Sequence, residues 1–198
     1  MIDKIKQPFP PNNSTDLTSL RQWLRQLFHK LAYKEGDFVL SSGQRSSYYI
    51  NGKQVTLHPQ GALAIGRLLL SMLPVDTQAV AGLTLGADPI VTAVSIISAL
   101  ENRPIPALII RKEPKGHGTM AYIEGPTLAA GAKVVVLEDV VTTGKSAMKA
   151  VEHLKNAGYQ VEQVIALVDR QQGGAQLYQS VGLKFQAVFN IEDIRQYE

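Results

Sequence analysis

The sequence predicts an α/β fold: a doubly wound, mainly parallel sheet with helices on both faces, preceded by a small N-terminal helix and strand addition. Short apolar runs alternate with helical stretches along most of the chain, which is typical of this class. The runs ALII (107–110) and VVVL (134–137) are continuously apolar, as expected for parallel strands that are covered on both faces. The chain has 198 residues and is 45% apolar, enough for one domain with a substantial core.

The N-terminal addition is predicted from local signals. Residues 1–15 are rich in Pro and Asn and lack periodicity, so we expect a flexible arm, with 16–198 forming the single domain. Asp16 is a suitable N-cap, and apolar residues then recur at three- and four-residue steps, which predicts an amphipathic helix that ends near Gly36. FVLSSGQRSSYYIN (38–51) indicates two short strands around a Ser-Gly turn.

The remaining elements follow a regular alternation. A helix is expected after Pro59, because proline suits a first helical turn. A polar stretch at 111–126 interrupts the alternation. The predicted strands are 78–83, 106–110, 133–139, 163–169 and 184–189, and the predicted helices are 89–102, 145–158 and a short one near 175–182. Sheets of this kind bind ligands at the carboxyl ends of their strands.

Composition excludes several function classes. The formal net charge is +3 and the pI is about 9.1, an excess of basic residues too small and too scattered to indicate nucleic-acid binding. Without cysteine, disulfides and thiolate metal sites are excluded. The N-terminus lacks the apolar segment of a signal peptide, and no apolar run approaches the roughly 20 residues of a membrane span. We therefore expect a cytoplasmic protein that binds neither nucleic acid nor membrane.

The motif VVVLEDVVTTGKS (134–146) carries the most specific chemistry. Its last letters match a P-loop, but a P-loop requires glycine where this chain has Asp139. The turn after the strand offers backbone N–H groups, hydroxyls and a helix N-terminus, which suit one phosphate. Glu138 and Asp139 suit sugar hydroxyls or hydrated Mg²⁺. A ribose 5-phosphate satisfies both halves; alternatively, Asp139 caps the next helix and the threonines are ordinary turn residues.

A second candidate site lies in the polar stretch. Arg111, Lys112, Lys115 and His117 fall within seven residues, beside two glycines. Such a cluster could clasp a polyanion such as pyrophosphate and stabilise charge that develops on it as it leaves. His117 could donate a proton or a hydrogen bond to that group. The alternative is a solvated basic loop.

The motif at 134–146 resembles the signature by which type I phosphoribosyltransferases bind phosphoribosyl pyrophosphate (PRPP). In that family the acidic pair contacts the ribose hydroxyls and the threonine-glycine turn holds the 5′-phosphate. The resemblance implies the type I phosphoribosyltransferase fold. It also implies PRPP-binding roles for Glu138, Asp139, Val140, Val141, Thr142, Thr143, Gly144, Lys145 and Ser146.

The pattern RKxxKxHG, which begins at Arg111, resembles the catalytic loop of the orotate phosphoribosyltransferase family, and the likeness extends over nearly the whole chain beyond the arm. Segments 38–51, 82–90 and 168–174 resemble its orotate-side segment, its pyrophosphate loop and its carboxylate-binding segment. The family's reaction transfers phosphoribose from PRPP to orotate, giving orotidine 5′-monophosphate and pyrophosphate in pyrimidine biosynthesis. The resemblance implies a homodimer in which the 111–118 loop is shared across subunits. It also implies Mg²⁺ that is held mainly by PRPP or pyrophosphate, with no metal ligands from the protein. It also implies catalytic roles for Arg111, Lys112, Lys115 and His117.

Arg170 stands at a predicted strand end, where its planar fork could match a carboxylate, a group that orotate carries and uracil lacks. Thr142 is expected to contact the pyrimidine as well as PRPP. Tyr48 and Tyr49 could pack on the base or belong to the core. A surface ion pair is the simpler alternative for Arg170.

Three positions depart from the resemblance, one of them Gly116, where some members have Asp before the loop histidine. Some members of the family have lysine where this chain has Ser41 and Gly86. The exact orotate and pyrophosphate contacts therefore stay open. Two other functions also stay open: a phosphoribosyltransferase for another nucleobase, and a PRPP-sensing regulator that uses the same fold.

Overall fold

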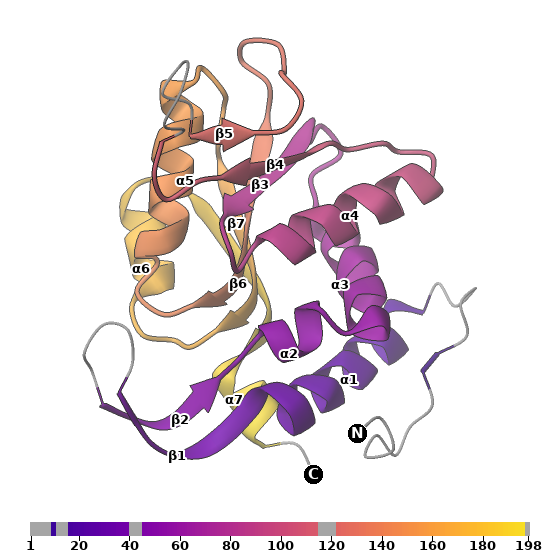
Figure 1. Ribbon diagram of the computed structural model, residues 1–198, viewed down its shortest axis with the longest axis vertical. Helices are drawn as coiled ribbons and strands as arrows, with labels where there is room; N and C mark the ends of the chain where they lie inside the picture. The colour runs from indigo at the N-terminus through magenta and orange to yellow at the C-terminus, as the bar shows by residue number, and fades with distance from the viewer. Residues whose placement is uncertain (1–8, 11–15, 40–44, 115–121, 197–198) are drawn as a thin grey trace.

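The computed structural model describes residues 9–10, 16–39, 45–114 and 122–196, and its centre is a six-stranded sheet in the order β5-β4-β3-β6-β7-β8 (Figure 1). All neighbouring strands are parallel except β4 and β5. The predicted doubly wound, mainly parallel sheet is confirmed. The strands are β3 (Ala79–Leu83), β4 (Ala107–Ile110), β5 (Ile123–Glu124), β6 (Val134–Val141), β7 (Gln163–Asp169) and β8 (Lys184–Asn190).

Both faces of the sheet are buried, which explains the continuous apolar runs. Along β6, Val135 and Leu137 join one core cluster, whereas Val134 and Val136 join the other. Helices α3 (Pro59–Met72) and α4 (Asp88–Leu100) pack in the first cluster; α5 (Lys145–Asn156) and α6 (Gly174–Ser180) pack in the second (Figure 1). Alternate side chains of one strand therefore have apolar partners on opposite faces, as a parallel sheet covered by helices requires.

The N-terminal addition differs from its prediction at one boundary. Helix α1 (Leu17–Leu27) begins after Asp16, whose carboxylate accepts the N–H groups of Thr18 and Ser19, and a π-helical turn continues it to Ala32. The prediction that the helix reaches Gly36 is wrong, because β1 (Tyr33–Val39) already pairs with β2 (Arg45–Ile50) from the Tyr33–Ile50 pair onward. The two strands form a sheet of their own, and the predicted hairpin is confirmed outside its turn, which lies beyond the described residues.

Three short elements were not predicted: α2 (Lys53–Thr56), β5 and α7 (Ile191–Arg195). Each is too short to show a hydrophobic period. Helix α7 is defined instead by a capping box, in which Asn190 and Asp193 exchange side-chain and backbone hydrogen bonds. Strand β6 also continues two residues beyond its predicted end, to Val141.

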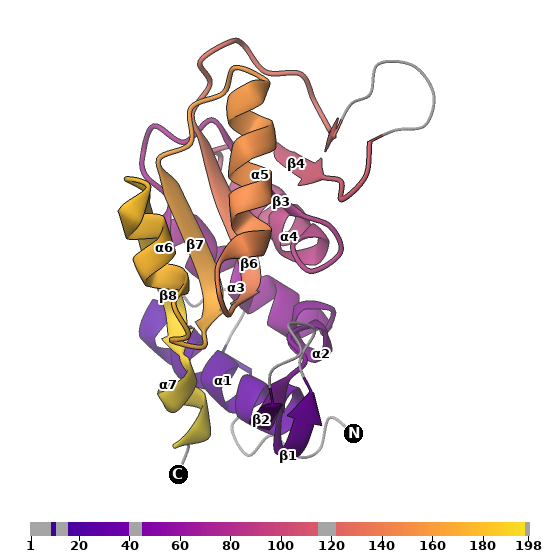
Figure 2. The ribbon, with the colours of Figure 1, turned by 90° about the vertical axis from the view of Figure 1, so that its left-hand side faces the viewer.

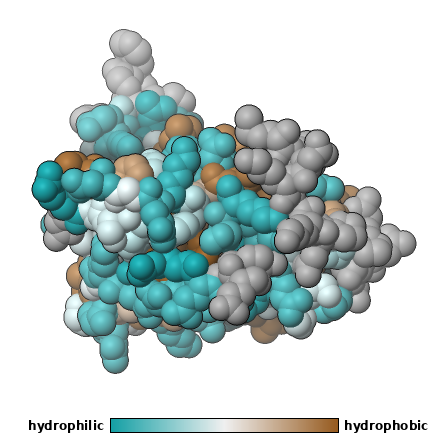
Figure 3. Space-filling view, turned by 90° about the horizontal axis from the view of Figure 1, so that it is seen from below, coloured by the Kyte–Doolittle hydropathy of each residue, from teal (hydrophilic) through white to brown (hydrophobic). Residues whose placement is uncertain are grey.

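The carboxyl ends of β6, β7 and β8 point toward the β1–β2 hairpin and α7 (Figure 2). Seen from that end, the surface of the described residues is mostly hydrophilic with small apolar patches (Figure 3). No helix among the described residues combines the length and the apolarity that a membrane span needs.

Within the predicted arm, Phe9 packs edge-on against Trp23, with ring centroids 4.8 Å apart. The division of the chain at residue 15 stays a prediction.

Candidate active site

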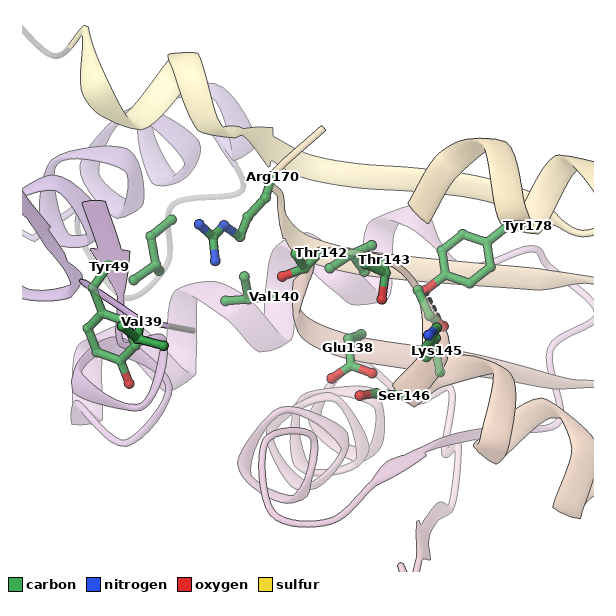
Figure 4. Close-up of a pocket in the computed structure, with 14 residues that line it drawn as sticks. Val39, Tyr49, Glu138, Val140, Thr142, Thr143, Lys145, Ser146, Arg170 and Tyr178 are labelled. Carbon is green, nitrogen blue, oxygen red and sulfur yellow. Dashed lines mark hydrogen bonds between the residues drawn. The ribbon is translucent and has the colours of Figure 1, made fainter. Parts of the chain in front are cut away.

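Strand β6 extends further than its neighbour β3. A cavity of about 460 Å³ lies beside the part of β6 that does not pair with β3. Pairing with β3 stops at Ala81 and Val136, whereas pairing with β7 continues to Val141 and Asp169. Such a divergence of neighbouring strands is where open α/β sheets bind ligands. The cavity is lined by Val39, Tyr49, Ile50, Glu138, Val140, Val141, Thr142, Thr143, Gly144, Lys145, Ser146, Ala147, Arg170 and Tyr178 (Figure 4).

Glu138 is a buried carboxylate in the cavity wall. Its Oε2 atom is buried and has no hydrogen-bond partner among the described residues. Burial, and then the neighbouring charge of Asp139, raise the pKa of Glu138 well above its usual range, while the charge of Lys112 acts in the opposite direction. A buried acceptor of this kind suits hydroxyl donors or the water of a hydrated cation.

Asp139 is fixed beside the cavity by close backbone contacts. Its Oδ1 accepts the N–H of Val140 at 2.9 Å. A Cβ atom placed on Gly86 would lie 2.6 Å from that oxygen, so glycine at 86 leaves the space that the carboxylate occupies. The alternative that Asp139 caps the next helix is wrong, because the N-cap of α5 is Gly144 and no side chain caps it.

Two residues of α6 contact the turn that leads into α5. Gly144 has φ +80, a left-handed conformation that favours glycine. The fully buried Tyr178 lies against it: its hydroxyl donates to the Gly144 carbonyl at 3.3 Å, and a Cβ on Gly144 would lie 3.0 Å from its ring. Gly174 N–H donates to the Thr142 carbonyl at 3.2 Å. Because no side chain caps α5, its first N–H groups stay available at the cavity for an anion.

Arg170 is buried, with 6% of its surface exposed, and its guanidinium donates hydrogen bonds to two hydroxyl groups. Its Nε donates to the Tyr48 hydroxyl at 3.2 Å and its Nη2 to Ser46 Oγ at 3.1 Å. Its Cζ lies 4.6 Å from the centre of the Tyr48 ring, and no described carboxylate forms a salt bridge with it. The surface ion pair considered for Arg170 is therefore not present among the described residues. Tyr49 lines the cavity while Tyr48 is buried, as alternation along a strand requires.

Eight of the nine predicted PRPP-binding positions line the cavity, and Asp139 adjoins it. Arg111 does not line the cavity but forms a salt bridge with Glu124 of β5 at 3.2 Å. Lys112 does not line it either, but its charge acts to lower the pKa of Glu138. Lys115 and His117 lie outside the described residues, as does Ser41. In the described part of the chain, no group of three or more His, Cys, Asp or Glu residues could hold a metal ion.

Sequence reasoning missed several residues of the site. Ser46 and Tyr178 support Arg170 and the turn through single hydroxyls, and neither belongs to a local pattern that could have indicated it. Val39, Ile50 and Ala147 complete the cavity wall. Ala147 follows directly on the recognised motif, so extending that motif by one residue would have found it.

Comparison with known proteins agrees with this geometry. A family model described as "Phosphoribosyl transferase domain" matches residues 53–192. Orotate phosphoribosyltransferase from Nostoc sp. is 78% identical over 183 residues, covering 92% of this chain and 89% of the relative. The Synechocystis sp. enzyme of the same name is 72% identical over 180 residues, 91% of each chain. The crystal structure of Mycobacterium tuberculosis orotate phosphoribosyltransferase in complex with PRPP is similar with a TM-score of 0.74 and 36% identity, covering 89% of this chain and 99% of that one.

Proposed function

The chain belongs to the orotate phosphoribosyltransferase family, and on this premise we propose how its cavity holds the two substrates and which residues act on them. The reaction transfers phosphoribose from PRPP to orotate and gives orotidine 5′-monophosphate and pyrophosphate, a step of pyrimidine biosynthesis.

PRPP lies along the β6–α5 segment in this proposal. The uncapped N-terminus of α5 and the hydroxyls of Thr142, Thr143 and Ser146 hold the 5′-phosphate. Glu138 and Asp139 then receive the ribose hydroxyls, because those hydroxyls can donate to the unpartnered carboxylate oxygen of Glu138. This division explains why two acids precede a phosphate-binding turn: they contact a different part of the same ligand.

Orotate lies between the turn and the hairpin. Arg170 holds its carboxylate, Thr142 contacts the pyrimidine and Tyr49 packs beside it. The observation that carries this assignment is a buried cation without a salt bridge to any described carboxylate, at the wall of the cavity that also contains the PRPP motif.

Mg²⁺ fits this site only as an ion held mainly by the substrate. The described residues offer two adjacent acids at the cavity but no cluster of three ligands, a donor set that suits a hydrated ion whose other ligands are substrate oxygens. When bound, the ion neutralises charge on the pyrophosphate as it leaves. Glu138 and Asp139 would hold it through the ribose hydroxyls and water.

The leaving group is handled by the 111–118 loop. Lys115 and His117 stabilise and protonate the departing pyrophosphate, with Arg111 and Lys112 at the base of the loop. The Arg111–Glu124 pair must then open before Arg111 can reach the ligand; both partners are about two-fifths exposed, so little free energy opposes this. We further propose that the loop acts in the partner's site of a homodimer and that the reaction takes place in the cytoplasm, because its charged substrates do not cross membranes unaided.

A base-competition assay tests the function. Loss of orotate absorbance should require PRPP and Mg²⁺, and uracil or a purine should not replace orotate at equal concentration. Equal turnover of another base would reassign the substrate. Sequence-specific nucleic-acid binding without turnover would indicate a regulator instead.

Subunit mixing tests the shared loop. Lys115→Ala and Asp139→Asn proteins are each expected to be nearly inactive, because each lacks one half of the site. Mixed dimers should regain part of the activity, since one of the two sites then combines an intact loop with an intact acidic pair. Size-exclusion chromatography of the mixture checks that dimers formed, and absence of recovery in mixed dimers would contradict the shared site.

A further inference from the structure

Arg170 is held in an unusual way for a buried cation: its anchors are neutral. Both hydroxyls that it contacts come from the same strand, β2, at positions 46 and 48. A buried arginine is commonly paired with a carboxylate, which would cancel its charge. Two hydroxyl acceptors fix the guanidinium but leave its positive charge to be balanced by a ligand.

The Ser46 hydroxyl is itself oriented. It donates its proton to the Tyr48 carbonyl at 2.7 Å and accepts the Tyr48 N–H at 3.3 Å. With its proton committed to the carbonyl, the oxygen presents only lone pairs to Arg170. The Tyr48 hydroxyl and ring add a second acceptor and an aromatic face 4.6 Å from the guanidinium carbon.

This arrangement uses particular N–H groups of Arg170. A guanidinium has five N–H donors, of which the Nε proton and one Nη2 proton meet the hydroxyls. Three protons are left over, and one on Nη1 and one on Nη2 form a parallel fork at the Nη1–Nη2 end. A carboxylate matches that fork with two parallel hydrogen bonds, one to each of its oxygens, and also balances the positive charge; a carbonyl oxygen offers neither the second oxygen nor the charge.

We propose that Ser46 and Tyr48 are positioning residues that set carboxylate specificity: they hold Arg170 side-on and keep it un-neutralised, so that its free end selects a nucleobase bearing a carboxylate. Neither residue touches the base in this proposal. The inference rests on the proposed role of Arg170 in orotate binding. The experiment distinguishes a failure of that role from a failure of the positioning role of Ser46 and Tyr48.

The test measures KM for orotate, KM for PRPP and the inhibition constant of uracil for four purified variants of the full chain. Tyr48→Phe keeps the ring and removes only the hydroxyl; Ser46→Ala removes the second anchor. Each should raise KM for orotate by about 3- to 10-fold, the size of effect of one ordinary hydrogen bond, because Arg170 loses one of its two anchors and is held less well for the carboxylate. KM for PRPP and the inhibition constant of uracil, which lacks the carboxylate, should stay at the wild-type values.

Tyr33→Phe is the matched control. Tyr33 lies on the other strand of the same hairpin, and its hydroxyl donates to Glu35 at 3.0 Å, not to Arg170. The same chemical change should therefore leave KM for orotate unchanged. Arg170→Met, the fourth variant, should raise KM for orotate more than either hydroxyl variant. Because KM values do not depend on the fraction of active protein, partial loss of folding cannot imitate the result.

The outcomes are distinct. If Arg170→Met leaves KM for orotate unchanged, the assignment of Arg170 to the carboxylate is wrong, and the inference falls with it. If Arg170→Met raises KM for orotate while Tyr48→Phe and Ser46→Ala behave like Tyr33→Phe, Arg170 binds orotate without needing its anchors. If the hydroxyl variants raise KM for PRPP equally, the two residues only maintain the overall structure. The last two outcomes overturn the positioning role alone.

Discussion

The two sides of the cavity are built in different ways. The phosphate side is built mainly from one continuous segment, from Glu138 within β6 to Ala147 in α5, with Tyr178 of α6 packed against the turn. The base side combines Val39 of β1, Tyr49 and Ile50 of β2, and Arg170 after β7. Residues up to 131 positions apart in the chain therefore meet on that side, as the Val39 and Arg170 numbers show.

This difference determines what each side tolerates. On the phosphate side, the groups that we propose bind PRPP, both backbone N–H groups and side chains, come from one segment, so the conformation of that segment is critical and few substitutions can preserve it. On the base side, side chains provide the binding groups, and each depends on a support from another element, as Arg170 depends on β2. Apart from Thr142, which we place against both substrates, substitutions on the first side should change the use of PRPP, and those on the second the use of orotate.

The largest effect is expected at Asp139. Asp139→Asn keeps the size of the side chain but removes its charge beside the ribose. We expect kcat/KM for PRPP to fall by roughly 10²- to 10³-fold, the size of effect seen when one stabilising group is removed from an active site. Steady-state kinetics with each substrate varied in turn checks this, and KM for orotate should change little. Unchanged kinetics would remove the role assigned to the acidic pair.

Gly144→Ala tests the backbone of the phosphate side. Alanine at φ +80 costs about 1–2 kcal/mol, and its Cβ would lie 3.0 Å from the Tyr178 ring. We expect the free energy of unfolding to fall by about 2 kcal/mol and KM for PRPP to rise by about tenfold. Urea denaturation and steady-state kinetics measure the two effects.

Gly158→Ala provides the control for this substitution. Gly158 has φ +86, but nothing lies within 4 Å of its Cβ position, and the residue stands beyond the far end of α5. It should show the loss of stability from backbone strain with no change in KM for PRPP. If both variants affect PRPP binding equally, the conformation at Gly144 has no special function.

Glu138→Gln should make the protein more stable at neutral pH, although less active. Because burial and the charge of Asp139 raise the pKa of Glu138 in the folded protein, the unfolded chain releases the proton first as pH rises. Between the ordinary value of about 4.3 and the raised one, the folded state loses up to about 1.4 kcal/mol per pH unit. Glutamine does not titrate, so it avoids this loss.

Urea denaturation of both proteins from pH 4 to pH 8 measures the difference. The stability advantage of Glu138→Gln should be absent near pH 4, grow with rising pH and level off above the raised pKa. An advantage that does not depend on pH would contradict the account of the buried carboxylate. Turnover of PRPP should fall most above the raised pKa, where the wild-type carboxylate is charged and is the stronger acceptor for the ribose hydroxyls.

The smallest effect is expected at Tyr178. Tyr178→Phe removes only the hydroxyl that donates to the Gly144 carbonyl, a contribution of about 0.5–1.5 kcal/mol. KM for PRPP should rise a few-fold at most, with no change in KM for orotate. Tyr159→Phe is the control, since its hydroxyl accepts from Leu128 N–H at 3.4 Å outside the cavity. A rise in KM for orotate from Tyr178→Phe would break the separation of the two sides.

The same contrast explains how much could be predicted from the sequence. The phosphate side follows from a single strand-turn-helix motif, because residues adjacent in the chain remain adjacent in the site. Arg170 was predicted from a resemblance, but its anchors Ser46 and Tyr48 were not, because they approach it from more than a hundred residues away. Element boundaries were predicted wrongly where strand pairing begins before the expected end of a helix, as at Tyr33, which pairs with Ile50 of β2.

The hairpin of β1 and β2 is a sheet separate from the six-stranded one. Because the two sheets are separate, substitutions in the hairpin can reach the base side of the cavity without changing the segment that we propose holds PRPP. Substitutions at residues 46 to 50 should therefore alter the use of the base and leave the strand-turn-helix segment intact. The guanidinium of Arg170, which follows β7 of the large sheet and is anchored by β2 of the hairpin, connects the two sheets at the cavity.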